Sequence, residues 1–222
     1  MKFLFKIFKI IVALFLLPFC AGAVIALWKI ILLSGKAEMT WIAILAGALF
    51  FILIYIFLPE PKWMYVLGHE LTHALWSLPF GGKLKKIKVK SDGGHVLITK
   101  SNFLVSLAPY FFPLYAVLVV IIFLIGNLFW DWTQYVLWFY FFIGLAYAFH
   151  ITLTFRILKI RQPDIVKEGY IFSTIIIFLG NMFVLLIGIT LLTTKISVLA
   201  SLNLWFANSL QIYYYLGQFI NL

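Results

Sequence analysis

Charged residues are scarce in this chain. Asp, Glu, Lys and Arg make up 11% of its 222 residues, and hydrophobic residues make up 65%. A soluble domain is usually about a quarter charged and about half apolar, so this composition argues against a soluble globular protein. Apolar runs long enough to cross a bilayer recur along the chain, which predicts an integral membrane protein with several spans.

Cysteine is almost absent, since Cys20 is the only one in the chain. A single thiol excludes an intramolecular disulfide, and it also excludes a zinc site built from cysteine ligands. Any zinc site in this protein must therefore use other side chains.

Acidic residues are few as well, with 7 Asp and Glu against 17 Lys and Arg and a net charge of +10. Basic residues are typical of cytoplasmic loops and of contact with anionic lipid headgroups. No nucleic-acid motif accompanies them, so we expect a lipid bilayer as partner and no nucleic acid. A metal transporter would need several carboxylates or histidines along a path, and the chain has too few. Each carboxylate near a span is instead a candidate functional group.

Apolar runs predict how the chain is organised in the membrane. Spans are expected at about residues 10–33, 40–58, 103–125, 132–155 and 170–192, with a polar loop at 156–169. A less apolar segment at 198–216 is a sixth span or an interfacial helix. The expected fold class is membrane all-α, a polytopic bundle of about five to seven hydrophobic helices with one small β-hairpin. We expect residues 1–222 to form a single integral membrane domain.

The most informative motif is HExxH, which begins at His69. Positions four apart lie on one face of a helix, so His69 and His73 could bind one zinc ion while Glu70 acts as a general base. The Pro-Phe-Gly-Gly sequence that follows predicts the end of this helix, which should cover residues 62–78. The helix is short for a span and carries His69, Glu70 and His73 in its middle, so we do not expect it to cross the bilayer alone.

A basic β-hairpin is predicted directly after this helix. Lysine alternates with Leu, Ile and Val through much of residues 83–90, turn residues follow at 91–94, and residues 95–99 form the return strand. One interpretation is that a strand edge binds an unwound substrate segment by strand addition. The other is that the lysines lie on anionic headgroups, and the sequence favours neither.

Three features of the chain, in this order, resemble the site-2-protease-like zinc metalloproteases of the membrane. They are HExxH on an apolar helix, a glycine-containing strand segment at residues 80–95, and the proline-containing start of a span at 107–113. The resemblance covers about residues 63–116. It implies a zinc-dependent endopeptidase that cleaves membrane-anchored proteins within or beside the bilayer, with Glu70 as the catalytic residue.

A third zinc ligand is needed, because catalytic zinc usually has three protein ligands and an open position. In the family that the chain resembles a distant Asp completes the site, and the resemblance offers Asp164 as the partner of His69 and His73. Asp164 directly follows a proline and opens a span. His150 is the rival ligand, since it is expected near the same membrane face. His95 is a weaker candidate, because a polar residue just after a Gly-Gly turn ordinarily faces solvent.

Basic residues also predict the orientation. They place the N-terminus, the hairpin and residues 156–167 on the cytoplasmic side, and the candidate site close to that side. This orientation requires that the HExxH helix enters and leaves the membrane on the cytoplasmic side, or that the hairpin itself inserts into the membrane. Otherwise HExxH lies on a true crossing and the first apolar stretch does not cross cleanly.

The alternative to a peptidase is a catalytically inactive relative of the same family. In such a protein a structural zinc site would serve binding or assembly, and loss of Glu70 would leave the function intact. A hydrolase that acts on something other than protein is also compatible with HExxH.

Overall fold

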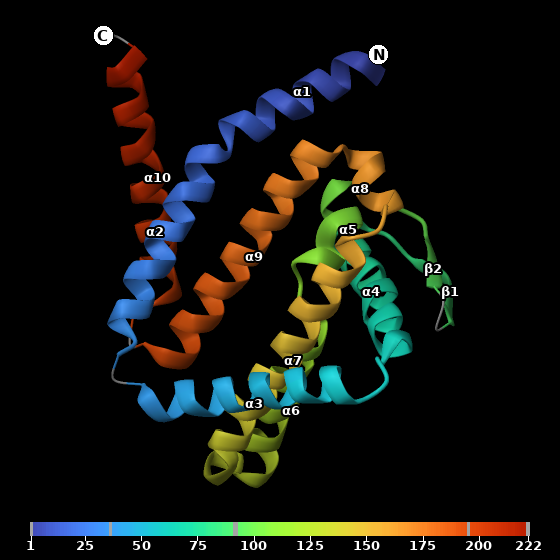
Figure 1. The fold of residues 1–222 in the computed structure, drawn as a ribbon, viewed down its shortest axis with the longest axis vertical. Helices are drawn as coiled ribbons and strands as arrows, with labels where there is room; N and C mark the ends of the chain where they lie inside the picture. The colour runs from blue at the N-terminus through green and yellow to red at the C-terminus, as the bar shows by residue number, and fades with distance from the viewer. Residues whose placement is uncertain (1, 36, 91–92, 195, 221–222) are drawn as a thin grey trace. The chain divides into compact units, whose positions relative to one another are not determined.

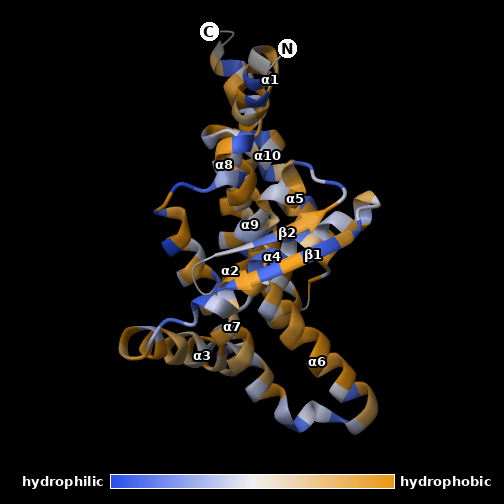
Figure 2. Cartoon of the chain, turned by 90° about the vertical axis from the view of Figure 1, so that its right-hand side faces the viewer, coloured by the Kyte–Doolittle hydropathy of each residue, from blue (hydrophilic) through white to orange (hydrophobic). Residues whose placement is uncertain are grey.

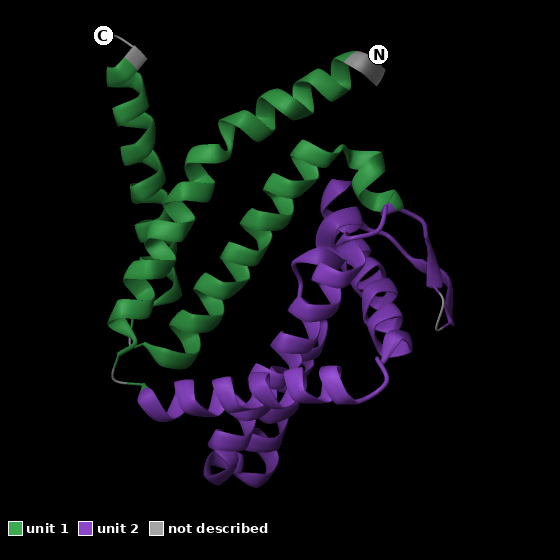
Figure 3. Cartoon of the chain, viewed as in Figure 1, with its two compact units in different colours: residues 1–37, 163–222 green, residues 38–162 purple. Residues whose placement is uncertain are grey.

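The computed structural model describes residues 2–35, 37–90, 93–194 and 196–220, and Figure 1 labels their helices and strands. Residue contacts divide the chain into two compact units, which Figure 3 colours separately. Unit 1 consists of Met1–Ala37 and Pro163–Leu222, and unit 2 of Glu38–Gln162. The single domain expected from the sequence stays a prediction.

Unit 1 is built from helices. They are α1 (Lys2–Phe15), α2 (Leu17–Leu33), α8 (Pro163–Glu168), α9 (Tyr170–Thr193) and α10 (Val198–Ile220). The helix α2 packs against α9 and α10, and Gly22 allows the close approach to α10 because a Cβ there would overlap Ser209. The hydroxyl groups of Thr190 and Ser201 share a hydrogen bond of 2.8 Å between α9 and α10.

An ion pair joins α1 to α8 within unit 1. Lys9 Nζ lies 2.5 Å from a carboxylate oxygen of Glu168, and both side chains are largely buried. The Lys9 ammonium group also lies 5.0 Å from the ring centroid of Phe5 and 5.4 Å from that of Phe172. This pair holds α8, which carries Asp164 in its first turn, against α1.

Unit 2 contains the HExxH helix and the hairpin. Its elements are α3 (Glu38–Phe57), α4 (Lys62–Ser77), β1 (Leu84–Lys90), β2 (Gly93–Ile98), α5 (Phe103–Leu107), α6 (Leu114–Trp130) and α7 (Val136–Leu158), with the 3-10 turns η1 (Leu78–Phe80), η2 (Ala108–Tyr110) and η3 (Trp132–Tyr135). The helices α3 and α7 cross at Gly47 and Gly144, where a Cβ would overlap the backbone of the facing helix. A core joins α3, α4 and α7 and consists of Phe51, Tyr65, Phe149 and Leu153.

The predicted hairpin is present. The strands β1 and β2 pair antiparallel, with Ile87 opposite Val96 and an irregularity between Leu84 and Lys86. Hydrophilic and hydrophobic colours alternate along β1 in Figure 2, as the lysine pattern predicts. Both strands pack against α4. Turn residues 91 and 92 lie outside the described residues.

Apolar helices of span length are confirmed in the described part of the chain. Four stretches are long and apolar enough to cross a membrane, namely Leu4–Leu33, Glu38–Phe57, Trp132–Leu158 and Tyr170–Thr193. On α3, the side chains of Leu45, Leu49 and Ile56 are all more than half exposed, as lipid-facing side chains would be. This architecture is compatible with an integral membrane protein.

One predicted span is not continuous. The expected span at 103–125 is divided into α5 with η2 and then α6, and the two parts are bent by 81°. Pro109 and Pro113 explain the break, because a proline lacks the amide N–H that a helix needs and clashes with the preceding turn. If the bent pair counts as one span, the described residues contain five candidate spans.

The segment predicted as a polar loop at 156–169 is partly helical. The helix α7 continues to Leu158, and α8 occupies Pro163–Glu168. Proline is favoured at the first helical position and an acidic side chain in the first turn, which accounts for Pro163 and Asp164 at the start of α8. The last segment forms the helix α10 and is not among the candidate spans of the described residues.

Candidate metal centre

The motif HExxH lies on α4, as predicted. The helix begins after Pro61 and ends at η1. Gly68 lets α6 approach the helix directly before the motif, because a Cβ at this position would lie 2.7 Å from the Tyr115 ring. The Tyr115 hydroxyl donates a hydrogen bond of 2.5 Å to the carbonyl oxygen of Met64. These contacts fix the turn of α4 that leads into His69.

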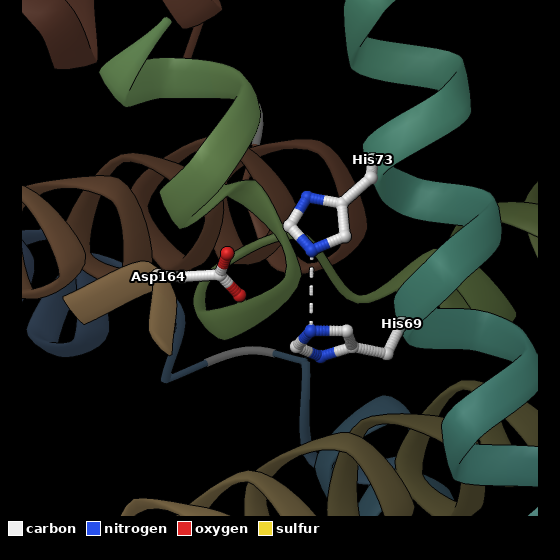
Figure 4. A group of neighbouring side chains, drawn as sticks. All are labelled: His69, His73 and Asp164. Atoms are coloured by element: carbon white, nitrogen blue, oxygen red, sulfur yellow. Dashed lines mark hydrogen bonds between the residues drawn. The ribbon is translucent and has the colours of Figure 1, made fainter. Parts of the chain in front are cut away.

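The two histidines are spaced for one metal ion. The Nε2 atoms of His69 and His73 lie 3.2 Å apart, within hydrogen-bond distance. Figure 4 marks this contact with a dashed line. Two nitrogen ligands of a tetrahedral zinc ion, each about 2.0–2.1 Å from it, would be about 3.3 Å apart. The pair therefore has the separation that binding to a shared ion requires.

The orientation of His73 also suits a metal ligand. Its Nδ1 donates a hydrogen bond of 2.8 Å to the carbonyl oxygen of Val105 in a buried environment. A ligating histidine usually donates its second ring N–H to a carbonyl in this way and binds the metal through the other nitrogen, which here is the Nε2 beside His69. Val105 is completely buried in α5, and its N–H is bonded to the side chain of the capping residue Asn102. This partner could not be predicted from the sequence, because a backbone carbonyl has no side-chain signature.

The carboxylate of the motif lies beneath the hairpin. Glu70 is buried, at 8% exposure. A Cβ at Gly94 of β2 would lie 3.0 Å from Glu70 Cγ and 2.6 Å from a methyl carbon of Val66. The strand β2 therefore packs directly on the motif at its acidic residue. Gly94 was predicted only as a turn residue, and its contact with Glu70 is a site feature that the sequence did not reveal.

The third predicted ligand comes from a different part of the chain. Figure 4 labels the predicted set, with His69 and His73 on α4 and Asp164 on α8. The helix α4 belongs to unit 2 and α8 belongs to unit 1, and each unit is described by itself. Asp164 as the third zinc ligand therefore remains a prediction.

The two rival ligands are both in unit 2. His150 is buried on α7 and lines a partly open cavity together with His69. The cavity has a volume of about 20 Å³, and its remaining lining is Tyr65, Gly68, Thr72, Pro109, Phe112, Leu114, Tyr115 and Phe149. His95 is exposed on β2, opposite Lys88.

The donors at this centre could hold a metal ion. Imidazole nitrogens suit zinc and several other transition metals, and a carboxylate would complete the set commonly found at catalytic zinc. No protein-family model, no curated protein and no solved structure matches the chain. What the centre can do therefore follows from its own donors and their geometry.

Proposed function

We propose that this protein is a zinc-dependent endopeptidase that hydrolyses peptide bonds of membrane-anchored proteins within or beside the bilayer. The observation that carries the proposal is the 3.2 Å separation of the His69 and His73 Nε2 atoms. Glu70 follows the first of these residues on the same helix. The resemblance of residues 63–116 to site-2-protease-like metalloproteases supports the same chemistry.

The proposed ligands are His69, His73 and Asp164. A zinc ion held there would act as a Lewis acid that polarises the scissile carbonyl and makes water nucleophilic near neutral pH. Glu70 takes a proton from the attacking water and passes it to the leaving amine nitrogen as the C–N bond breaks. Its burial under β2 keeps the carboxylate in place for both transfers.

The hairpin suggests how substrate reaches Glu70. A helix in lipid hides its peptide bonds in internal hydrogen bonds, so a substrate segment must become extended before it is cut. A two-stranded sheet leaves an outer edge on each strand, to which an extended segment can add through backbone hydrogen bonds. Contact between Gly94 and Glu70 would bring such a segment close to the general base. The lysines of β1 also suit anionic headgroups, so the hairpin and the centre are proposed to face the cytoplasmic side.

The test compares detergent-purified wild type with Glu70→Gln, which is nearly isosteric. We expect about one zinc per chain in both proteins, measured by elemental analysis. Cleavage of an unstructured protein such as casein should fall about 10²- to 10⁴-fold in the variant, because the general base is lost.

Two results would decide against this proposal. Well-folded wild type without zinc would rule out the hydrolase. The other result has three parts: both proteins bind zinc, neither cleaves the substrate, and Glu70→Gln performs the cellular function of the protein as well as wild type. This result would favour the inactive relative with a structural zinc site.

A further inference from the structure

A stripe of polar groups on α7 is not used by the proposed zinc site. Tyr147 Oη, His150 Nε2 and Thr154 Oγ1 are buried and have no hydrogen-bond partner among the described residues. Positions three and four apart share a helix face, so these groups form one stripe along an apolar helix. Buried polar groups in a native protein are normally satisfied, and those kept in a membrane helix usually face a cavity and serve a function.

Only part of this stripe reaches the cavity beside the histidine pair. His150 lines the cavity together with His69. Two other polar lining groups are already engaged, because the Thr72 hydroxyl donates to Gly68 and the Tyr115 hydroxyl donates to Met64. His150 is 6% exposed and keeps its Nε2 for a molecule that enters the cavity.

The hydrogen bonds of His150 differ from those of His73, and the difference favours a hydrogen-bond donor over a metal ligand. A ligating histidine usually binds a carbonyl or carboxylate through its second nitrogen, as His73 does with Val105. No such bond orients the ring of His150 among the described residues. Its environment is otherwise mostly apolar, where a hydrogen bond to a developing charge is stronger than in water.

We propose that His150 donates a hydrogen bond to the oxygen of the scissile carbonyl while water attacks the carbonyl carbon. This inference rests on the proposed peptidase function. As the C–O bond to water forms, the π electron pair of the carbonyl moves onto its oxygen, and the N–H of His150 stabilises that charge. The water proton goes to Glu70 and then to the amine nitrogen that leaves. His150 thus contacts the substrate and is not a ligand of the metal.

The test uses His150→Phe, which removes the donor, and His150→Asn, which keeps one. Tyr147→Phe is the matched control, because it lies on the same stripe but does not line the cavity. Zinc content, kcat and KM on a quenched fluorescent peptide, and the affinity for a peptidyl phosphinate are measured for each. The phosphinate mimics the tetrahedral geometry and charge of the transition state.

We expect His150→Phe to keep its zinc and its KM while kcat falls about 10²- to 10³-fold. Its affinity for the phosphinate should fall in parallel, since that compound resembles the transition state. His150→Asn should recover part of both losses, and Tyr147→Phe should resemble wild type.

Three results would overturn the inference. Loss of zinc in His150→Phe would make His150 a metal ligand. An active wild type with an unchanged kcat in His150→Phe would leave His150 without a role in catalysis. A zinc-free wild type that neither cleaves the peptide nor binds the phosphinate would instead overturn the proposed function, and this inference with it.

Discussion

At the scale of single residues, the centre depends on a hydrogen bond that orients one ring. The bond from His73 Nδ1 to Val105 turns Nε2 towards its neighbour His69. Sequence alone could place both histidines on one helix face, because HExxH fixes their spacing. It could not show Val105, whose contribution is a backbone oxygen brought in by the fold.

The first prediction concerns Asp164. We expect Asp164→Asn to lose zinc on dialysis while wild type keeps it, because the amide is a much weaker metal ligand than a carboxylate. Even loss of an outer hydrogen-bond partner costs about 10- to 100-fold in metal affinity, and loss of a ligand should cost more. Elemental analysis after dialysis against a weak chelator measures the effect.

Asp131→Asn is the matched control, since it also removes one carboxylate. Asp131 caps α6 with a left-handed backbone conformation that asparagine tolerates. Equal zinc retention in wild type and both variants would remove Asp164 from the ligand set, and His150 would then be the rival to examine.

At the scale of elements, we expect the packing of the hairpin on the HExxH helix to depend on Gly94. A Cβ at this position would meet Val66, Glu70 and the carbonyl oxygen of Lys88 at 3.0 Å or less. We expect Gly94→Ala to destabilise the protein by about 1–3 kcal/mol, the usual cost of overpacking, and to reduce cleavage more than zinc content. Thermal unfolding in detergent and the two assays above measure these effects.

Gly188→Ala is the control for Gly94→Ala, because a Cβ at position 188 would meet nothing within 4 Å. It should be neutral or slightly stabilising, since alanine favours a helix. If both alanine variants behaved alike, the packing of β2 on Glu70 would have no effect on catalysis.

The ion pair between α1 and α8 gives a third prediction. Lys9→Met removes the nearest cation of the buried Glu168 carboxylate and leaves only the exposed Lys167, at 3.9 Å. Breaking a buried pair typically costs about 3–5 kcal/mol, and we expect Lys167 to keep the loss at or below the lower end of this range. The double variant Lys9→Met with Glu168→Gln removes both charges and should recover much of this loss. Thermal unfolding of the single and double variants gives the comparison, and an equally unstable double variant would contradict it.

Element prediction from the sequence worked where a pattern was long and regular. Sequence period predicts the helix of 62–78 and the alternating strands, and the length of the apolar runs predicts four long helices. The bend at Pro109 and Pro113 was not predicted, because hydropathy over 103–125 is continuous and says nothing about direction. The helix α8 was missed because six residues are too few to show a period, although Pro163 and Asp164 are good start signals.

At the scale of the whole molecule, the exposed apolar surface distinguishes insertion into a membrane from binding to its surface by charge. A basic chain could bind anionic headgroups through its charge of +10 alone. The exposed side chains of α3 are compatible with insertion instead, since burying each Leu or Ile contributes about 1.5–3 kcal/mol. Release of the chain from the membrane into water would therefore cost several kcal/mol for the side chains of Leu45, Leu49 and Ile56 alone.

The last prediction follows from this difference. We expect the chain to stay in the membrane pellet after washes with high salt and with alkaline carbonate, and to leave it only in detergent. Salt screens the attraction of lysines to headgroups, but it does not weaken the burial of apolar helices. Immunoblots of pellet and supernatant measure the outcome. Release by salt would mean that charge alone holds the chain at the membrane, and the apolar faces of α3 and α9 would then need a protein partner to cover them.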